Sequence, residues 1–147
     1  MFEFEADRKY FEAHLCSHGE SIEDFQNMFD FRPAVEKRNE FNRNRSTLLF
    51  QLLSKHGENC MLDFSMCDIN SGINVDHLIP LATNKLNKEL RNLKAEPGRK
   101  VKSQSFGSNH IDNLIIACAD CNNYKKHRII ERAKIQSILR AKAGKTD

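Results

Sequence analysis

The sequence contains no apolar run long enough to cross a bilayer. A membrane-spanning helix needs about 20 mostly apolar residues, and no stretch of that kind occurs among the 147 residues. A basic and then apolar leader is also missing, because three of the first seven residues are acidic. We therefore expect no contact with membranes and a cytoplasmic location. Internal repeats are absent as well, so the length indicates one domain with an appended helical layer.

Cysteine is scarce, with five residues in the chain. In a reducing compartment, such cysteines favour a metal site or free thiols over disulfides. Cys118 and Cys121 form a Cys-x-x-Cys pair, whereas six residues separate Cys60 from Cys67. A tight turn is therefore not expected at the upstream pair, and a longer hairpin would have to bring its two thiolates together. Cys16 is left without a partner in this scheme.

The net charge of +3 conceals an uneven distribution along the chain. Residues 1–40 contain five Lys/Arg and ten Asp/Glu, whereas residues 41–147 contain eighteen and ten. A basic region of this kind predicts a polyanionic partner, and nucleic acid is the usual one. The alternative is an ordinary basic soluble domain.

The N-terminal part of the chain predicts helices. Residues 7–19 and 21–31 suit two short helices. A longer one should begin at Pro33, whose ring fits a first helical turn, and should end before Gly57. We therefore expect residues 1–56 to form an N-terminal helical extension. The first half of the long helix carries four cations that either face DNA or form a solvated surface: Lys37, Arg38, Arg43 and Arg45.

Residues 57–147 predict two strands and a closing helix. Residues 73–76 and 114–118 suit the strands, and residues 122–142 suit the helix. Between the strands, leucines recur at helical spacing and a basic loop follows, so we expect a basic insertion at about residues 84–108. The predicted fold class is α+β and mostly helical.

Two short polar motifs carry the candidate chemistry. The first reads Val-Asp-His-Leu-Ile-Pro and places Asp76 and His77 at the end of the first predicted strand. The second runs from residue 109 to residue 127 and contains Asn113, the Cys-x-x-Cys pair and Asn122. Together they supply oxygen ligands for a metal, a base and a positioning group, which are the parts that a phosphodiester hydrolase needs.

This order of residues resembles the HNH, or ββα-metal, nuclease family. In that family an Asp-His or His-His pair ends the first strand, an Asn precedes the second strand, and a His or Asn follows on a helix. Asp76-His77, Asn113 and Asn122 match those positions. The resemblance covers roughly residues 57–140. It departs from the family in the wide spacing of the upstream cysteines and in the thirty-five residues between His77 and Asn113, which imply an inserted element.

The resemblance implies metal-dependent cleavage of phosphodiesters. Asp76 and Asn122 would offer oxygen ligands to Mg²⁺, Mn²⁺ or another divalent ion and leave positions open for phosphate and water. His77 would be the general base, because an imidazole with a pKa of about 6.5 can accept a proton from water near neutral pH. Asn113 would brace the backbone around His77. The simpler alternatives are turn residues at Asp76 and Asn113 and a helix cap at Asn122.

Many members of the family also hold a structural zinc ion with two cysteine pairs. Here the resemblance implies one tetrahedral Zn²⁺ site formed by Cys60, Cys67, Cys118 and Cys121. The alternative leaves Cys60 and Cys67 as buried free thiols.

Basic side chains near the motifs are candidate DNA contacts. Lys126 lies four residues after Asn122 and therefore on the same helical face. We expect Lys126 and its neighbour Lys125 to contact phosphate. In the basic insertion, the predicted DNA-binding residues are Lys88, Arg91, Lys94, Arg99 and Lys100.

The sequence thus predicts an HNH-type endonuclease that acts on DNA, with double-stranded DNA as the expected partner. Restriction, phage-encoded and homing enzymes are the settings that we consider. Because one ββα site cuts one strand, double-strand cleavage would favour a homodimer. One rival hypothesis is a zinc-stabilised nucleic-acid-binding module without catalysis. The other is an RNase or a structure-selective nuclease that uses the same site.

Overall fold

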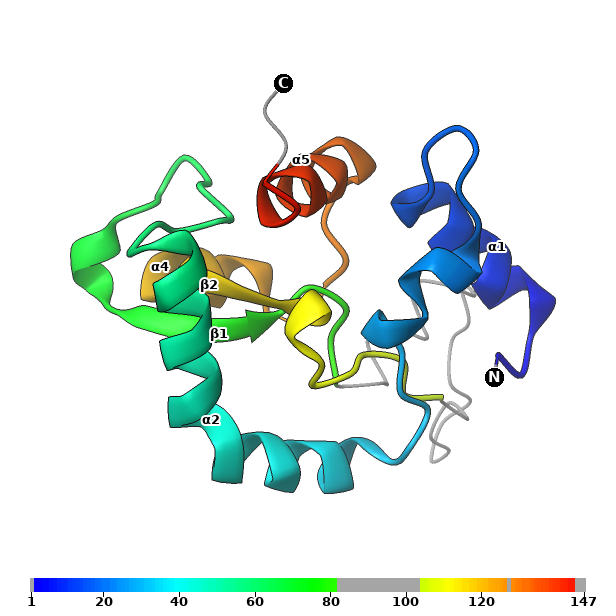
Figure 1. Ribbon diagram of the computed structural model, residues 1–147, viewed down its shortest axis with the longest axis horizontal. Coiled ribbons are helices and arrows are strands. Elements are labelled where there is room, and N and C mark those ends of the chain that lie inside the picture. Colours follow the sequence, from blue (N-terminus) through cyan, green and yellow to red (C-terminus); the bar gives the residue numbers. More distant parts are fainter. Residues whose placement is uncertain (1, 82–103, 127, 145–147) are drawn as a thin grey trace, which may run out of the picture.

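The computed structural model describes residues 2–81, 104–126 and 128–144. Within these ranges the chain is an α+β fold, about half helical, with a two-stranded antiparallel sheet (Figure 1). In chain order the elements are α1 (Glu5–Leu15), the 3-10 helix η1 (Ile22–Met28), α2 (Ala34–His56), the 3-10 helix η2 (Ile69–Ser71), β1 (Ile73–His77), the 3-10 helix η3 (Ile111–Asn113), β2 (Leu114–Cys118), α4 (Ala119–Lys125) and α5 (Arg132–Lys142). None of the described helices combines the length and apolar character that crossing a membrane requires.

Most of the predicted basic insertion lies outside the described residues. This applies to its helix and to the five DNA-binding residues predicted there: Lys88, Arg91, Lys94, Arg99 and Lys100.

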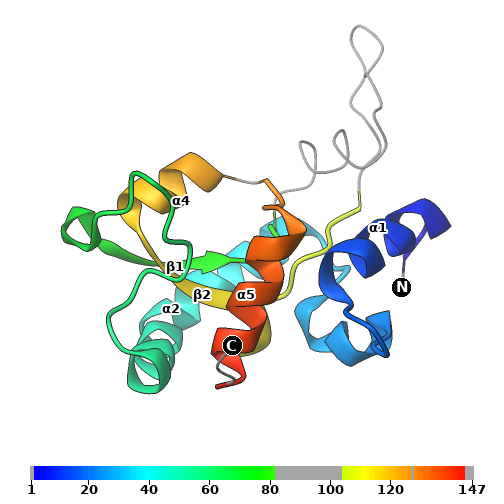
Figure 2. The same cartoon turned by 90° about the horizontal axis from the view of Figure 1, so that it is seen from above.

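The two strands and the helix that follows them form a ββα-like unit. β1 pairs antiparallel with β2, with Val75 opposite Ile116 and His77 opposite Leu114. α4 begins at the residue after β2 and packs against both strands. Figure 2 shows the sheet between α4 and α2, and α2 also contacts both strands. The end of β1 therefore lies between two helices.

Strand β2 is buried along its whole length because both of its faces are covered. Successive side chains of a strand point to opposite faces. Leu114 and Ile116 pack in a cluster with residues of α2, including Phe41 and Leu52. The intervening Ile115 and Ala117 belong to the larger cluster that contains the buried residues Phe11, Leu15, Ile135 and Ile138 of α1 and α5. The N-terminal helices therefore complete the hydrophobic core of the chain.

The long N-terminal helix forms as the sequence predicts. α2 ends at His56, and Gly57 follows with a φ of +73°, a conformation that glycine adopts without a steric penalty. Lys37 is fully buried on this helix, and its Nζ donates to the carbonyl oxygens of Asp30 at 2.5 Å and Gly107 at 2.6 Å. Neither of the two roles considered for Lys37, a DNA contact or a solvated charge, fits this position.

The predicted closing helix is wrong in one respect, because it is two helices. α4 ends at Lys125, and Lys126 turns the chain with a φ of +53°. α5 begins at Arg132 and packs against α1. The break allows Ile135 and Ile138 to be buried in the core. We attribute the break to this burial, since apolar contact can offset the helical hydrogen bonds that a turn removes.

The second predicted short helix, at residues 21–31, is the 3-10 helix η1.

Residues 104–109 connect the N-terminal elements with the sheet. Asp30 N donates to Phe106 O at 2.8 Å, and Ser108 N donates to Met28 O at 3.0 Å. Gly107 lies so close to the chain after β1 that a Cβ atom there would be 1.9 Å from the carbonyl oxygen of Ile79. This approach requires glycine, and it fixes the segment that leads to Asn109.

Candidate active site and metal centre

A cleft of about 440 Å³ lies at the end of β1, between α2 and α4. Three residues that the sequence analysis assigned to catalysis and metal binding line it together, namely Asp76, His77 and Asn122. The remaining lining residues are Arg38, Phe41, Asn42, Pro80, Leu81, Asn123 and Lys126. The cleft therefore combines a carboxylate, an imidazole and amide groups with two cations.

Asp76 is the carboxylate of this cleft, and both of its oxygens have partners. Oδ1 accepts from the backbone N–H of His77 at 2.9 Å, and Oδ2 lies 3.1 Å from Nζ of Lys125. Asp76 belongs to β1, so the alternative of a turn residue is wrong. Its place at the strand end, directed toward α4, follows from the packing of that helix on the strand.

Lys125 does not reach the surface, and its predicted phosphate contact is therefore wrong for this structure. Its side chain is 0% exposed, and Nζ donates to the carbonyl oxygen of His77 at 2.9 Å in addition to its pairing with Asp76. Lys125 lies on the side of α4 that packs against β1. A buried ammonium must be paired because its removal from water is costly. Lys125 thus positions Asp76, whereas Lys126 is exposed and lines the cleft.

His77 is held by one hydrogen bond and one ring contact. Its Nε2 lies 2.9 Å from Oδ1 of Asn109, and its ring meets Phe41 edge-on with 4.6 Å between centroids. Burial lowers the pKa of His77 to about 4, with a further lowering by the charge of Lys125, while the Asn109 hydrogen bond acts in the opposite direction. The imidazole is therefore neutral near pH 7 and keeps a lone pair that can accept a proton.

Asn113 braces the backbone of the residues that follow His77 in the chain. Its Oδ1 accepts from Ile79 N at 2.8 Å, and its Nδ2 donates to Ile79 O at 3.0 Å and to Ser108 O at 2.9 Å. The side chain is fully buried, so these bonds are shielded from water. This is the bracing position that the family resemblance implied for Asn113.

Asn122 lies in the first turn of α4, partly buried, and lines the same cleft as Asp76. It does not cap the helix. The N-cap is Cys118, whose Sγ accepts from the backbone N–H of Cys121 at 3.3 Å. A carboxylate and an amide oxygen on one cleft are the donors that a hard divalent cation prefers. The residues present therefore fit such an ion, which would share the Asp76 carboxylate with Lys125.

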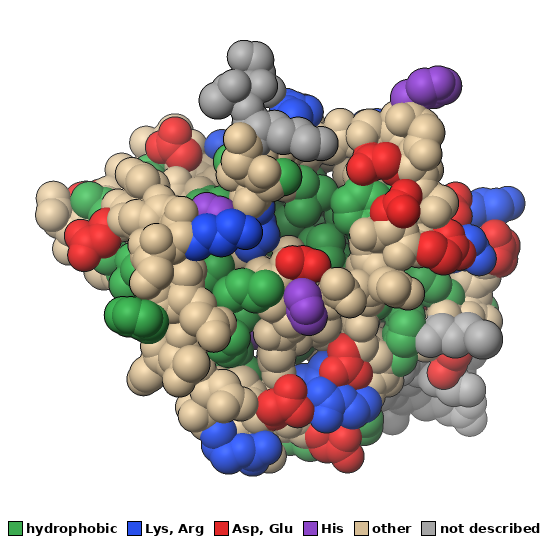
Figure 3. Space-filling model, in the orientation of Figure 1, with side chains coloured by type: hydrophobic (Ala, Val, Ile, Leu, Met, Phe, Trp, Pro, Cys, Tyr) green, Lys and Arg blue, Asp and Glu red, His purple; other side chains and the backbone are tan. Residues whose placement is uncertain are grey.

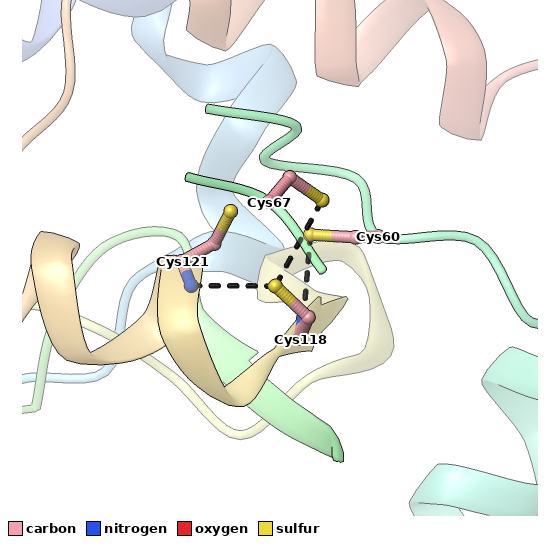
Figure 4. Close-up of side chains that lie close together, drawn as sticks. All are labelled: Cys60, Cys67, Cys118 and Cys121. Atoms are coloured by element: carbon pink, nitrogen blue, oxygen red, sulfur yellow. Dashed lines mark hydrogen bonds between the residues drawn. The ribbon is translucent and has the colours of Figure 1, made fainter. Parts of the chain in front are cut away.

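Four cysteines meet on another part of the ββα unit (Figure 4). The sulfur atoms of Cys60, Cys67, Cys118 and Cys121 all lie within 4.8 Å of one another. Tetrahedral Zn–S bonds of about 2.3 Å would place sulfurs about 3.8 Å apart, and Sγ of Cys118 lies 3.8 Å from Sγ of Cys67. The cluster could hold a metal ion and is compatible with structural zinc.

The widely spaced upstream cysteines reach this cluster without a tight turn between them. The loop after α2 runs beside β2, where Met61 N donates to Ile116 O at 2.8 Å. The backbone N–H of Cys118 then donates to Sγ of Cys60 at 3.2 Å. These hydrogen bonds hold the loop along one edge of β2. The loop thereby brings Cys60 and Cys67 together, the role that the sequence analysis gave to a longer hairpin.

The thiols of the cluster differ in acidity. Burial raises the pKa of Cys67 and raises that of Cys121 to about 11. Burial acts in the same direction on Cys118, but backbone N–H donors from Cys121 and Asp68 outweigh it and lower its pKa to about 6. One thiolate is thus favoured before any metal binds, and a metal would have to displace protons from other thiols.

Sequence reasoning missed two residues of the site, which are Asn109 and Phe41. Asn109 opens the second polar motif, but no spacing rule distinguishes it from other loop asparagines. Phe41 belongs to α2, which precedes the region covered by the family resemblance, and Arg38 of the same helix was considered only as one of four cations that either face DNA or are solvated. Only the packing of α2 against the sheet shows that it contributes to the cleft.

Comparison with known proteins identifies no relative, since the chain matches no family model, no curated protein and no solved structure. The resemblance to HNH nucleases therefore rests on the residues of this chain and on their arrangement.

Proposed function

We propose that this protein is a metal-dependent HNH-type endonuclease that hydrolyses phosphodiester bonds in DNA. The observation that carries the proposal is the shared cleft of Asp76, His77 and Asn122. Two oxygen donors for a hard cation lie there beside a neutral imidazole, and a binding module without catalysis would need neither.

The charges around the cleft support a polyanionic substrate. Arg38 of α2 and Lys126, the residue after α4, line it from its two sides. Asp76 is the only acid among the described lining residues, and its charge is balanced by Lys125. Phosphate groups are attracted to a cleft of this kind. The acidic residues described in the N-terminal region do not line this cleft, and Figure 3 shows several acidic side chains gathered over α1 and η1.

A second cleft of similar volume favours a polyanion less. It lies between η1, the end of α2 and α5, and it has acidic and basic residues side by side. Glu20, Asp24 and Asp112 line it together with Lys55, Arg140 and Lys142. Its three carboxylates balance its three cations, whereas the cleft at the end of β1 has two cations and one carboxylate that is already paired, so we place the substrate there.

In the proposed reaction, His77 accepts a proton from the water that attacks phosphorus. A divalent ion such as Mg²⁺, held by Asp76 and Asn122, would supply stabilisation of the negative charge on the phosphate. The oxygen of the water forms a bond to phosphorus as the bond to the 3′ oxygen breaks. The 3′ oxygen takes up a proton, so the products carry 5′-phosphate and 3′-hydroxyl ends, as the family resemblance implies. Lys125 and Asn113 hold Asp76 and the backbone after His77 in place during these steps.

We propose that the four-cysteine cluster binds a structural zinc ion. Four thiolates fill a tetrahedral coordination sphere and leave no position for substrate, so this ion would not take part in hydrolysis. It would connect the loop after α2 to the start of α4, which carries Asn122.

A plasmid-nicking assay tests the proposed nuclease activity. The parent protein should cut DNA with Mg²⁺ or Mn²⁺, supplied one at a time, and should stop cutting in EDTA. His77→Ala should lower cleavage about 10²–10⁴-fold, the usual contribution of a general base, and Asp76→Ala should abolish it. Asn44→Ala is the control, because Asn44 is exposed on α2 and, within the described part of the chain, its side chain bonds only to Glu40 O of the same helix.

The same assay separates the rival functions. DNA binding without cleavage under every metal condition would indicate a binding module. Parallel digestion of duplex, branched and single-stranded DNA and of RNA would reveal a structure-selective nuclease or an RNase. Equal cleavage by His77→Ala and the parent would refute the assignment of the site.

A further inference from the structure

We infer that Asn109 is a positioning residue that sets the tautomer of His77, so that Nε2 carries the proton and Nδ1 is the basic nitrogen. The inference deepens the proposed nuclease function and rests on it for the chemical use of that nitrogen. The tautomer itself follows from the hydrogen bonds of the described residues, whatever the reaction.

The orientation of the Asn109 amide is set by its contact with α2. Nδ2 of Asn109 donates to the backbone carbonyl oxygen of Lys37 at 2.7 Å. The amide oxygen therefore faces the other way, toward Nε2 of His77 at 2.9 Å. The reversed amide would place its oxygen against the Lys37 carbonyl, and two acceptors cannot bond to each other.

This orientation determines which ring nitrogen of His77 holds the proton. An amide oxygen is only an acceptor, so Nε2 must be the donor in the contact with Asn109. A neutral imidazole has one N–H, and the remaining lone pair is then on Nδ1. Among the described residues, Nδ1 has no hydrogen-bond partner in the structure. Nδ1 is therefore the atom that can take a proton from water.

The backbone on either side of Asn109 is also held. Ser108 O accepts from Asn113 Nδ2 at 2.9 Å, and Ser108 Oγ donates to Asn27 O at 2.6 Å. The buried ammonium of Lys37 donates to Gly107 O at 2.6 Å, so Lys37 contacts the segment both through its carbonyl oxygen and through its side chain. Helix α2 thereby takes part in orienting the imidazole.

The expected consequence is a loss of turnover without a loss of DNA affinity. Without the Asn109 acceptor, the imidazole would divide its population between two tautomers and rotate more freely. Partners that orient a functional histidine in this way typically contribute about 10–100-fold to activity. Asn109→Leu, which keeps the approximate shape of the side chain, should lower kcat by this factor and leave KM and the Kd for DNA unchanged.

Nitrogen NMR of the full-length protein, labelled with ¹⁵N in its histidine rings, tests the inference directly. The His77 signals are assigned by their disappearance in His77→Gln. At neutral pH the parent should show a protonated Nε2 and a Nδ1 with a lone pair. Asn109→Leu should show a mixture of both tautomers, and the Asn44→Ala control should match the parent.

The outcomes separate this inference from the proposed function. A protonated Nδ1 in the parent would overturn the inference even if Asn109→Leu failed to fold. An unchanged tautomer and an unchanged kcat in Asn109→Leu would overturn the role of Asn109. The expected tautomer in a parent protein that never cuts nucleic acid would refute the nuclease function and leave the tautomer assignment standing.

Discussion

Lys125 is a fully buried cation, and its burial depends on Asp76. Removing an ammonium from water is costly unless an opposite charge and hydrogen bonds replace the lost hydration. Lys125 has both, with Asp76 Oδ2 at 3.1 Å and the His77 carbonyl oxygen at 2.9 Å. One residue therefore connects α4 to the end of β1 and directs the carboxylate of the candidate site.

Replacing Lys125 by methionine should be strongly destabilising. The change leaves the Asp76 carboxylate, which is 12% exposed, without its charged partner. Breaking a buried ion pair costs about 3–5 kcal/mol of the free energy of unfolding. Lys126→Met is the matched control, because Lys126 is exposed and its replacement should change stability by less than about 0.5 kcal/mol. Urea denaturation of both variants measures the difference, and equal losses would contradict the assigned role of Lys125.

At the scale of elements, α2 and α4 form two sides of one cleft, and each contributes amide side chains. Cations lie at both sides, since Arg38 belongs to α2 and Lys126 follows α4. A phosphate chain in the cleft would thus have a basic partner on either side. The proposed substrate would bind across helices that are far apart in the sequence.

Changing Arg38 and Lys126 together to glutamine should weaken DNA binding in a salt-dependent manner. Each phosphate contact that is lost should reduce the slope of log affinity against log salt by about 0.9. Fluorescence anisotropy with labelled duplexes of several sequences measures this slope, and all duplexes should be affected alike. Arg43→Gln is the control, because Arg43 is exposed on α2 and does not line the cleft. The same slope in the double variant and in the parent would place the DNA elsewhere.

Residues 104–109 pass very close to the chain that follows β1, and this crossing is a second feature at the scale of elements. Gly107→Ala should be destabilising, because the new methyl group would meet Ile79 O at 1.9 Å and the backbone would have to move. Overpacking of this kind costs about 1–3 kcal/mol or more. Gly19→Ala should cost less, because only its φ of +86° is unfavourable and no atom lies within 4 Å. Thermal unfolding compares the two variants, and a larger loss at Gly19 would show that the crossing tolerates a side chain.

At the scale of the whole molecule, the cysteine cluster joins the loop after α2 to the end of β2 and the start of α4. We expect about one zinc ion per chain by elemental analysis, since a tetrahedral thiolate site holds one ion. Because binding free energy at such a site becomes folding free energy, Cys118→Ser should lose the ion and much of the stability. Cys16→Ser should keep both, because Cys16 is not part of the cluster. A folded parent without zinc would contradict this prediction.

The same site should make stability depend on pH. Burial raises the pKa of Cys67 and of Cys121, so protons compete with a metal for these sulfurs. Zinc affinity should therefore fall as the pH falls, and the thermal midpoint of the zinc-bound protein should fall with it. Zinc release, followed with a chromophoric chelator from pH 8 to about pH 5, measures the effect. The metal-free Cys118→Ser variant is the reference, because the change of its thermal midpoint with pH reports only the other titrating groups.

Features that depend on local patterns could be predicted from the sequence. The second strand is indicated by the short apolar run at residues 114–118, and the end of the long helix at His56 by the φ values open to the following Gly57. The meeting of Asp76, His77 and Asn122 was expected from their order along the chain. These features depend on neighbours that are close in sequence or on a known arrangement of two strands and a helix.

Which polar side chains are buried, and what they contact, depends on the packing of distant segments and could not be predicted from the sequence. Lys125 and Lys126 are adjacent in sequence, yet one pairs with Asp76 in the interior and the other lines the open cleft. Asn109 reaches His77 because Lys37, 72 residues away, holds its amide. Such contacts depend on how α2 packs against the sheet, which is set by the burial of apolar side chains from distant segments and leaves no local pattern in the sequence.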